Sequence, residues 1–261
     1  MTEQVKQHTL KQSQYHLLML LYKFQYISIP LLTTYKNLKS NSLQRNLNIL
    51  VDQNYIAKQY SAKDKLDRKP AIYYLGKKGI ATLRSDPRLD TQQLNTYYKN
   101  EMLTDDYKQR CIDTFAVYNN INAGYAGMFD IFTRQEIAHF ESLPATKPDL
   151  YLRGEPNYFL ILAHNLQPFL ARKQLNEYIT HFDEEGWSDG DYYPSMLFVL
   201  SSEARKQAFL TYADNALERA GIGYDELPIG ATTVDKMMTT PRTTAIWSFV
   251  GDSRALKALD G

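Results

Sequence analysis

The sequence predicts an α+β fold, with an N-terminal winged helix-turn-helix domain and a C-terminal α/β domain. Helical periodicity occurs in three segments of residues 10–53, and two tyrosine-rich strands follow them. Strand-like and helix-like segments mix from residue 105 onward. Residues 1–100 carry 16 Lys and Arg against 6 Asp and Glu, whereas the remaining 161 residues carry 14 against 23. We therefore expect two domains, and a polyanion as the partner of the basic one.

The composition indicates a globular protein. Hydrophobic residues make up 44% of the chain and charged residues 23%, which is ordinary for packed domains. The longest apolar runs, "LLMLLY" and "YFLILA", are too short to span a bilayer, and the N-terminus lacks a signal-peptide apolar region. The single cysteine cannot form an internal disulfide. We therefore expect a cytoplasmic protein with no membrane partner.

The first two helices follow from spacing and capping. A first helix over about 10–24 is predicted by apolar side chains three and four residues apart, namely Tyr15, Leu18, Met19 and Tyr22. Ser28 is placed to cap a second helix, because Pro30 is tolerated in a first turn. A short polar break, "NLKSN", then precedes a third helix over about 42–53.

The third helix has two distinct sides. Its apolar stripe, which must be the buried side, consists of Leu43, Leu47 and Leu50. Its other side and flank carry one arginine and three amides: Asn41, Gln44, Arg45 and Asn48. Arginine pairs well with guanine, and asparagine or glutamine with adenine, so this composition suits a helix that reads the major groove. A plain solvated surface is the alternative.

A basic β-hairpin follows this helix. The segments "YIAKQYS" and "AIYYLG" read as two short strands, and "GKKGIATLR" begins a fourth helix. The connector between the strands holds four basic residues: Lys63, Lys65, Arg68 and Lys69. Three helices and a basic hairpin predict a winged helix-turn-helix over residues 1–88, whose wing lies along a phosphate backbone. Double-stranded DNA is the expected ligand, while RNA binding and protein docking are the alternatives.

Residues 105–261 are expected to form the second domain, after a linker over 89–104. The linker is polar and has no sustained apolar period. A helix over about 105–122 should bury Cys111 as a small hydrophobe. Strands are expected near 137–141, 149–153, 158–163 and 195–200, and helices near 169–184 and 203–220. The run Leu197–Leu200 is apolar throughout, which is typical of a strand buried on both faces.

Several segments together resemble the replication-relaxation family, which is encoded mainly by bacterial plasmids and integrative elements. These segments cover most of residues 9–200: "TLKQSQYHLLMLLYKFQYIS", "SLQRNLNILVDQNYIAK", "IYYLGKKGIATL", "KPDLYL", "YFLILA" and "FLARKQLNEY". The resemblance implies a winged-helix domain joined to a domain similar to the PD-(D/E)xK nuclease fold. It also implies a role in the replication or transfer of a plasmid or mobile element.

The nuclease pattern is incomplete in this chain. That chemistry requires an Asp after Pro, then a Glu and a Lys two residues apart on the next strand, to hold a divalent metal. Pro148 and Asp149 supply the first part, but Ile161 stands at the acidic position, and no carboxylate or lysine lies between Tyr158 and His164. We therefore expect a degenerate site in which Asp149 is a remnant, with no catalytic residue, metal or cofactor. Lys173 is interpreted as a solvated helix residue rather than a phosphate ligand.

The leading hypothesis is a non-enzymatic DNA-binding protein in plasmid or mobile-element replication or transfer, or its regulation. Its acidic C-terminal domain would contact a replication or transfer protein or a second copy of the chain. One alternative is a transcriptional regulator with that domain as dimeriser. The other is a metal-dependent nuclease with a migrated carboxylate from Glu136, Glu141 or Glu177. The five histidines lack ligand-like spacing, and no glycine-rich phosphate loop occurs.

Overall fold

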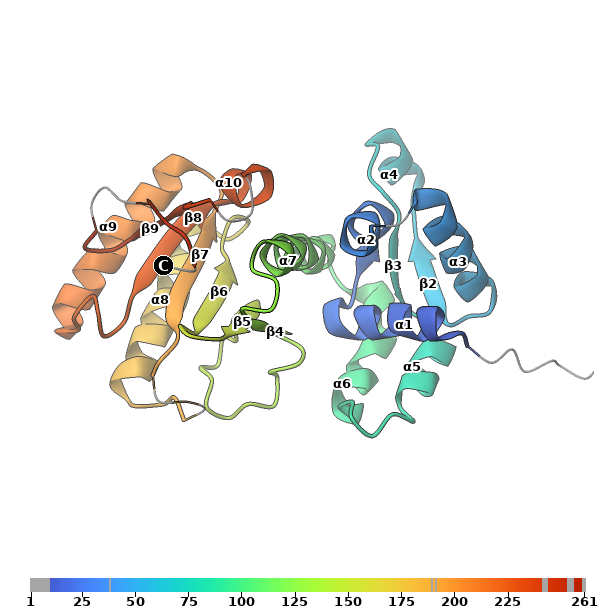
Figure 1. Ribbon diagram of the computed structural model, residues 1–261, viewed down its shortest axis with the longest axis horizontal. Coiled ribbons are helices and arrows are strands. Elements are labelled where there is room, and N and C mark those ends of the chain that lie inside the picture. Colours follow the sequence, from blue (N-terminus) through green and yellow to red (C-terminus); the bar gives the residue numbers. More distant parts are fainter. Residues whose placement is uncertain are drawn as a thin grey trace, which may run out of the picture. The chain divides into compact units, whose positions relative to one another are not determined.

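The computed structural model describes residues 10–37, 39–188, 190, 192–240, 244–252 and 256–259. Its secondary structure is mixed, 49% helical and 16% strand, which confirms the α+β class. The chain divides into two compact units, Met1–Ile112 and Asp113–Gly261, which are drawn in Figure 1. The two units are called unit 1 and unit 2 below, and each is described by itself.

Unit 1 combines short helices with a three-stranded antiparallel sheet of order β1-β3-β2. Its elements in chain order are α1 (Gln12–Phe24), β1 (Ile27–Ser28), α2 (Ile29–Lys36), α3 (Ser40–Asp52), β2 (Ile56–Gln59), α4 (Ala62–Leu66), β3 (Ile72–Leu75), α5 (Lys77–Leu83), α6 (Thr91–Thr96), the 3-10 helix η1 (Tyr97–Met102) and the start of α7 (Asp105–Gly124). The predicted hairpin is confirmed, because β2 pairs with β3 in a register that sets Ile56 opposite Leu75. Ser28 occupies the N-cap of α2 as expected, although its side chain makes no capping hydrogen bond.

The core of unit 1 is built from one face of each long helix. The predicted stripe of α3 is buried: Leu43, Leu47 and Leu50 are each at most 1% exposed. Leu18 and Leu21 of α1 are also fully buried. Burial of each such leucine contributes about 1.5–3 kcal/mol to the stability of the fold. The leucine face of α3 therefore stays in the core, and the opposite face is the one exposed to solvent. Cys111 is buried against Tyr26 and Tyr74, as expected of a small hydrophobe.

The segment expected to be a linker is folded onto unit 1. Residues 89–104 contain α6 and η1, and their inward side chains Leu94, Tyr97 and Asn100 are buried. The Tyr97 hydroxyl donates to the backbone carbonyl of Tyr22 at 2.6 Å, and the Gln25 side chain donates to Asn100 Oδ1 at 2.7 Å. The expectation was wrong because hydrogen bonds satisfy buried polar side chains here, so the buried positions do not form an apolar pattern. The division between the units falls instead within α7.

Unit 2 is built on a seven-stranded sheet of order β10-β9-β8-β7-β6-β5-β4, in which β6, β7 and β8 run parallel. Its further elements are β4 (Asp130–Thr133), β5 (Leu150–Arg153), β6 (Tyr158–Leu162), α8 (Pro168–Asp183), β7 (Ser195–Leu200), α9 (Glu203–Ala220), β8 (Ile229–Thr233), α10 (Val234–Thr239), β9 (Trp247–Phe249) and β10 (Leu256–Lys257). None of the helices described in either unit is long and apolar enough to cross a membrane.

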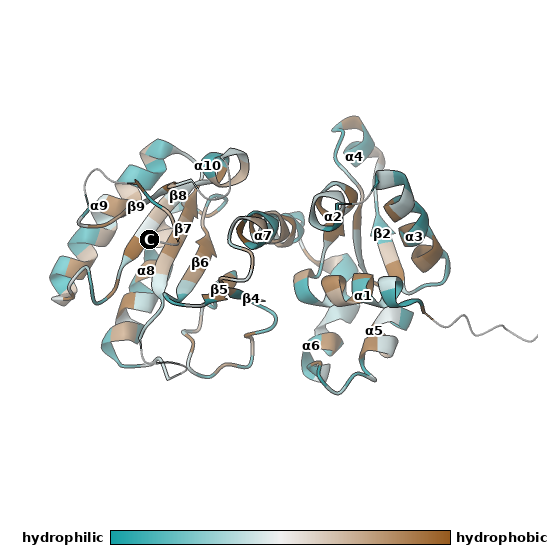
Figure 2. Ribbon diagram, viewed as in Figure 1, coloured by the Kyte–Doolittle hydropathy of each residue, from teal (hydrophilic) through white to brown (hydrophobic). Residues whose placement is uncertain are grey.

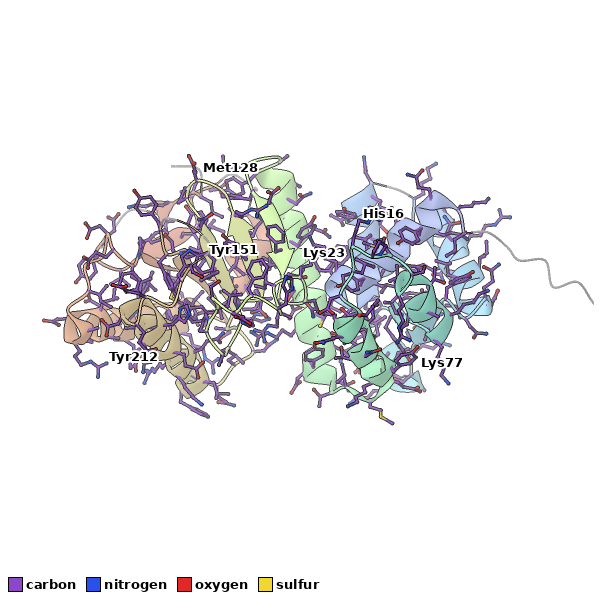
Figure 3. All side chains as sticks on the ribbon, turned by 90° about the horizontal axis from the view of Figure 1, so that it is seen from below. His16, Lys23, Lys77, Met128, Tyr151 and Tyr212 are labelled. Carbon is purple, nitrogen blue, oxygen red and sulfur yellow. The ribbon has the colours of Figure 1, made fainter. Side chains whose placement is uncertain are left out.

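Helices cover both faces of the unit 2 sheet. One face packs on α8 and α9, and the opposite face packs on the last turns of α7 and on α10. Alternate residues of β6 point to the two faces, so Ile161 packs on the α8 and α9 side and Leu160 on the other. Tyr151 of β5 lies in the first of these cores (Figure 3). The central strands are buried, as their brown colour in Figure 2 suggests, which confirms the expectation for Leu197–Leu200.

One predicted strand of unit 2 is wrong. Residues 134–139 form turns rather than a strand near 137–141, and the strand is β4, just before them. The amide of Ile137 donates to the Thr133 carbonyl at 3.2 Å, and the amide of Phe140 donates to Ile137. Ile137 belongs to this turn, and its side chain is fully buried in the core. The prediction was wrong because a buried apolar side chain is also typical of a strand. Strand β8, with sequence "IGATT", was missed because little in it is strongly apolar.

Candidate nucleic-acid interface

The polar side of α3 lies on the surface of unit 1. Asn41, Arg45 and Asn48 are exposed, and Gln44 on the flank is partly buried, while the leucine stripe faces the core. The first turn of α3 contains no acidic residue, and Asp52 stands at its far end. A helix N-terminus carries a partial positive charge, so this half of α3 favours an anionic ligand. The structure thus brings the four predicted residues to one accessible side.

Gln44 does not have the same freedom as its neighbours. Its side-chain amide nitrogen lies 3.0 Å from Asn48 Oδ1 and 3.2 Å from the hydroxyl of Tyr73, and donates to both. Tyr73 belongs to β3 and is fully buried, and burial raises the pKa of its hydroxyl. Gln44 therefore links α3 to the hairpin and orients Asn48, which keeps its own amide protons for a ligand.

Arg45 is the most available charged group on α3. In the described part of the chain no carboxylate lies within ion-pair distance of its guanidinium, and no side-chain hydrogen bond holds it. Its five N–H donors form a planar fork that fits two acceptors at once. The arrangement suits bidentate binding of a guanine edge or a phosphate.

The tip of the β2–β3 hairpin contains a capped helical turn, α4 (Ala62–Leu66). Ser61 caps it: the Asp64 amide donates to Ser61 Oγ at 3.1 Å, and Asp64 Oδ2 accepts from the Ser61 amide at 2.8 Å. These hydrogen bonds lower the pKa of the Asp64 carboxyl. The spacing "SAKD" is a capping-box signal that could have revealed this turn from the sequence.

The four predicted basic residues of the hairpin tip are all exposed: Lys63, Lys65, Arg68 and Lys69. Lys69 lies 3.8 Å from Asp67, an exposed pair that contributes little. Among the described residues, no carboxylate comes within ion-pair distance of Lys63, Lys65 or Arg68. Three cations thus lie without a close ion pair beside a turn whose residue Asp64 is engaged in its own cap.

Sequence reasoning missed two further basic residues on the same elements. Lys39 is the exposed N-cap of α3, because the helix begins two residues earlier than predicted. Lys58 is exposed on β2, with its ammonium 5.6 Å from the centre of the half-exposed Tyr60 ring. The alternation of a strand could have indicated Lys58. Successive side chains of a strand point to opposite faces, so Lys58 points away from the face of its neighbours Ala57 and Gln59.

In unit 2, Asp149 is a structural residue at the entry to β5. It is 3% exposed, its Oδ2 accepts from the Leu162 amide at 2.7 Å, and Arg134 Nη2 lies 3.4 Å from its Oδ1. Leu150 pairs with Leu160, so Asp149 stands opposite Ile161 across the two strands. Ile161 is fully buried in the α8 and α9 core. Ala163, where the resemblance leads to the expectation of a lysine, is 1% exposed in the same core.

The glutamates considered as migrated ligands have other contacts. The Glu136 carboxylate accepts from the Thr133 amide at 2.8 Å and from its hydroxyl. Glu177 accepts from the Thr146 hydroxyl and lies 3.9 Å from Lys173, which is itself exposed. Glu141 is exposed. In the part of the chain that the structure describes, no group of three or more His, Cys, Asp or Glu side chains is placed to hold a metal ion.

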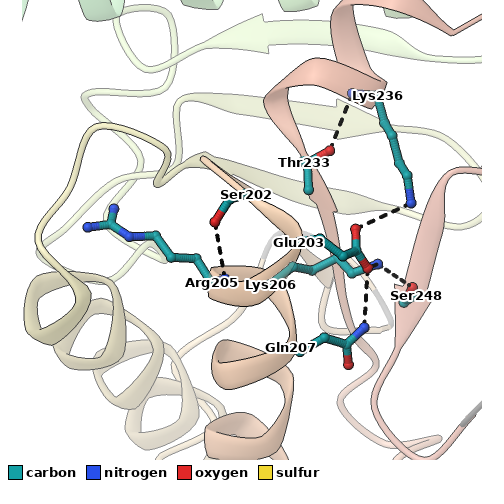
Figure 4. Close-up of polar contacts among 8 residues, drawn as sticks. All are labelled: Ser202, Glu203, Arg205, Lys206, Gln207, Thr233, Lys236 and Ser248. Atoms are coloured by element: carbon teal, nitrogen blue, oxygen red, sulfur yellow. Dashed lines mark hydrogen bonds and ion pairs between the residues drawn. The ribbon is translucent and has the colours of Figure 1, made fainter.

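A buried lysine anchors the start of α9, although lysine is a residue type rarely expected to be buried. Lys206 is 2% exposed, and its ammonium donates to Glu203 Oε1 at 2.5 Å and to Ser248 Oγ at 3.1 Å (Figure 4). Lys236 of α10 lies 3.4 Å from the other carboxylate oxygen, and the Lys206 hydrogen bond lowers the pKa of Glu203. A buried ammonium requires such partners, so the network ties α9 to α10 and β9.

No protein-family model, curated protein or solved structure matches the chain.

Proposed function

We propose that unit 1 is a winged helix-turn-helix domain that binds double-stranded DNA, with α3 in the major groove and the β2–β3 hairpin along the phosphate backbone. The observation that carries this proposal is the exposed Arg45, which has amides on both sides of it on α3 and lies in the same unit as the exposed basic residues of the hairpin tip. The groups suited to reading bases thus lie on α3, and the groups suited to binding phosphate lie on the hairpin. In such domains phosphate contacts supply affinity and position, and base contacts supply specificity.

On α3, the proposal is supported by the side-chain groups that remain available to bind a ligand. Arg45 presents an unengaged guanidinium, and Asn48 keeps amide protons while Gln44 fixes its carbonyl oxygen. Arg pairs with guanine and Asn with adenine in the major groove. Lys39 at the N-cap adds a cation where a helix N-terminus meets phosphate. The same side of α3 therefore offers both sequence readout and positioning.

The wider role rests on the resemblance and on charge. We propose that the protein acts without catalysis in the replication or transfer of a plasmid or mobile element, or in its regulation, in the cytoplasm. Residues 113–261, which form unit 2, carry 12 Lys and Arg against 20 Asp and Glu, which favours a protein partner over a second DNA contact there. A binding site at an origin of transfer would support this role, and one at a promoter would support a transcriptional regulator.

The test of DNA binding is a salt series on the full-length protein with a mixed-sequence duplex. Phosphate contacts release counterions, so the affinity should fall steeply as salt rises. Replacing Lys63, Lys65, Arg68 and Lys69 by Gln should lower the slope by about 1 for each phosphate contact removed. The control is Arg219→Gln, at an exposed position of α9, which should leave the slope unchanged. Absence of binding at low salt, or an affinity insensitive to salt, would contradict the proposal.

The non-enzymatic part has its own test. Ile161 and Ala163 put packed apolar groups where a nuclease places a carboxylate and an ammonium. Supercoiled and linear duplex should therefore remain intact with the wild-type protein and magnesium or manganese. Metal-dependent nicking that disappears in Asp149→Ala would overturn this part and favour the nuclease alternative.

A further inference from the structure

A small cavity of about 140 Å³ lies in unit 2, where the parallel strands β6 and β7 end and helices α8 and α9 begin. Its inner wall is formed by Ala163, Ala171, Leu200 and Phe209, each at most 4% exposed. Arg205 also lines it. Ala163 is the position at which the nuclease pattern requires a lysine, so the missing long side chain contributes to this space.

The cavity is suited to an apolar group. Protein interiors are normally close-packed, and an apolar void leaves the atoms that line it without dispersion partners. The cavity is open to solvent on the side of Pro168, Arg172 and Ala208, which are exposed. Its volume is close to that of an engineered apolar cavity of about 150 Å³ that binds benzene, so it has room for a ring or a short branched chain. Its inner walls are side-chain carbons, which offer water too few hydrogen-bond partners.

Two arginines give the cavity a cationic side. Arg205 Nη1 donates to the Leu166 carbonyl at 3.2 Å. This contact uses one of the five N–H donors of the guanidinium. The Arg172 guanidinium carbon lies 4.9 Å from the ring centre of Tyr212, a cation–π contact. Over the residues that the structure describes, neither arginine has a carboxylate within ion-pair distance. Planar guanidinium groups bind carboxylates through two parallel hydrogen bonds.

We propose that this cavity binds a small carboxylic acid with a compact apolar body, such as an aromatic acid. The apolar body fills the space between Ala163, Leu200 and Phe209, and the carboxylate pairs with Arg205 and Arg172. Inorganic phosphate would leave the apolar space empty, and a neutral hydrocarbon would leave the arginines unpaired. The site is separate from the residues proposed to bind DNA, so either proposal can fail without the other.

The test is isothermal titration of the full-length protein with sodium benzoate, benzyl alcohol and inorganic phosphate. Benzoate should bind saturably at one site, and benzyl alcohol and phosphate should each bind at least about tenfold more weakly, because each lacks one of the two interactions. Arg205→Gln should weaken benzoate by about tenfold or more and leave benzyl alcohol unchanged.

A pair of alanine variants on α9 localises the binding. Ala208 lines the cavity and is exposed, so Ala208→Leu should block benzoate without overpacking the core, whereas Ala204→Leu, one turn earlier and outside the lining, should not. Melting curves of both variants confirm that they are folded. The proposal is overturned if benzoate shows no saturable binding, if Ala208→Leu binds it as well as Ala204→Leu, or if phosphate binds equally well.

Discussion

Arg45 and Gln44 are neighbours with different roles, and only the structure separates them. Helical periodicity placed both on or beside the polar side of α3. The contact between Gln44 and the Tyr73 hydroxyl joins residues 29 positions apart, so no local pattern could reveal it. Composition and spacing thus predicted which side chains of α3 are accessible. How many donors and acceptors each of these side chains still has for a ligand can be known only from the tertiary contacts.

The first prediction concerns base reading. Arg45→Ala should cost about 1–3 kcal/mol of binding free energy on the preferred duplex and relax selectivity there, because a bidentate base contact is lost. Lys65→Ala should instead weaken all sequences about equally and reduce the salt slope by about 1, as a phosphate contact does. Affinities measured over a panel of duplexes distinguish these effects. Equal behaviour of the two variants would refute the assignment of α3 to bases and the hairpin to phosphates.

A second prediction concerns pH and the carboxylate of Asp86. The Arg88 guanidinium, and then the Tyr15 hydroxyl at 2.7 Å, hold its pKa well below the usual range. A depressed pKa contributes stability above the unfolded-state pKa and loses it as pH falls toward the folded-state pKa. Asp86→Asn should therefore lower the Tm at pH 7, and its difference from wild type should shrink once pH drops below about 3.9.

Thermal melts from pH 7 to pH 2 measure this difference. Asp52→Asn, at the exposed end of α3, is the matched control and should show little effect at any pH. A difference for Asp86→Asn that stays constant over the whole range would show that the charge of the carboxylate does not stabilise the fold.

The elements predicted well are those with a strong helical period or a continuous apolar run. Helices α1, α3, α8 and α9 bury apolar side chains at regular intervals, and strands β6 and β7 are buried almost throughout. The boundaries of all six agree with expectation within a few residues. Elements that bury polar groups were missed. Asn100 in η1 is 1% exposed and Thr232 in β8 is fully buried, and neither residue type signals burial in a sequence.

The third prediction belongs to the hairpin tip. Ser61→Ala removes the capping oxygen of α4 and should destabilise that turn by about 1 kcal/mol, while Ser61→Thr keeps the oxygen and should not. Faster amide hydrogen exchange at Asp64 and Lys65 is the expected signature. The exchange of α1 amides should not change, because the cap acts locally. Unchanged exchange at the tip would mean that Ser61 does not hold α4.

At the scale of the whole molecule, charge divides the chain more clearly than any motif does. The excess of Lys and Arg in residues 1–100 over Asp and Glu was visible in the sequence. The domain border was not, because α6 and η1 are polar in composition yet packed onto unit 1. The burial of Ile161 and Ala163 agrees with their apolar side chains, whereas the cavity beside Ala163 depends on the packing of two helices against strand ends.

The most direct test of the DNA-binding account is residue-resolved NMR of the full-length protein titrated with a short duplex. Backbone amide shifts should change most in residues 39–48 of α3 and 58–70 of the hairpin, and the changes should weaken as salt rises. Arg45→Ala should reduce the changes on α3 while those at the hairpin tip persist. Shift changes confined to unit 2, or none in either segment at low salt, would contradict the account.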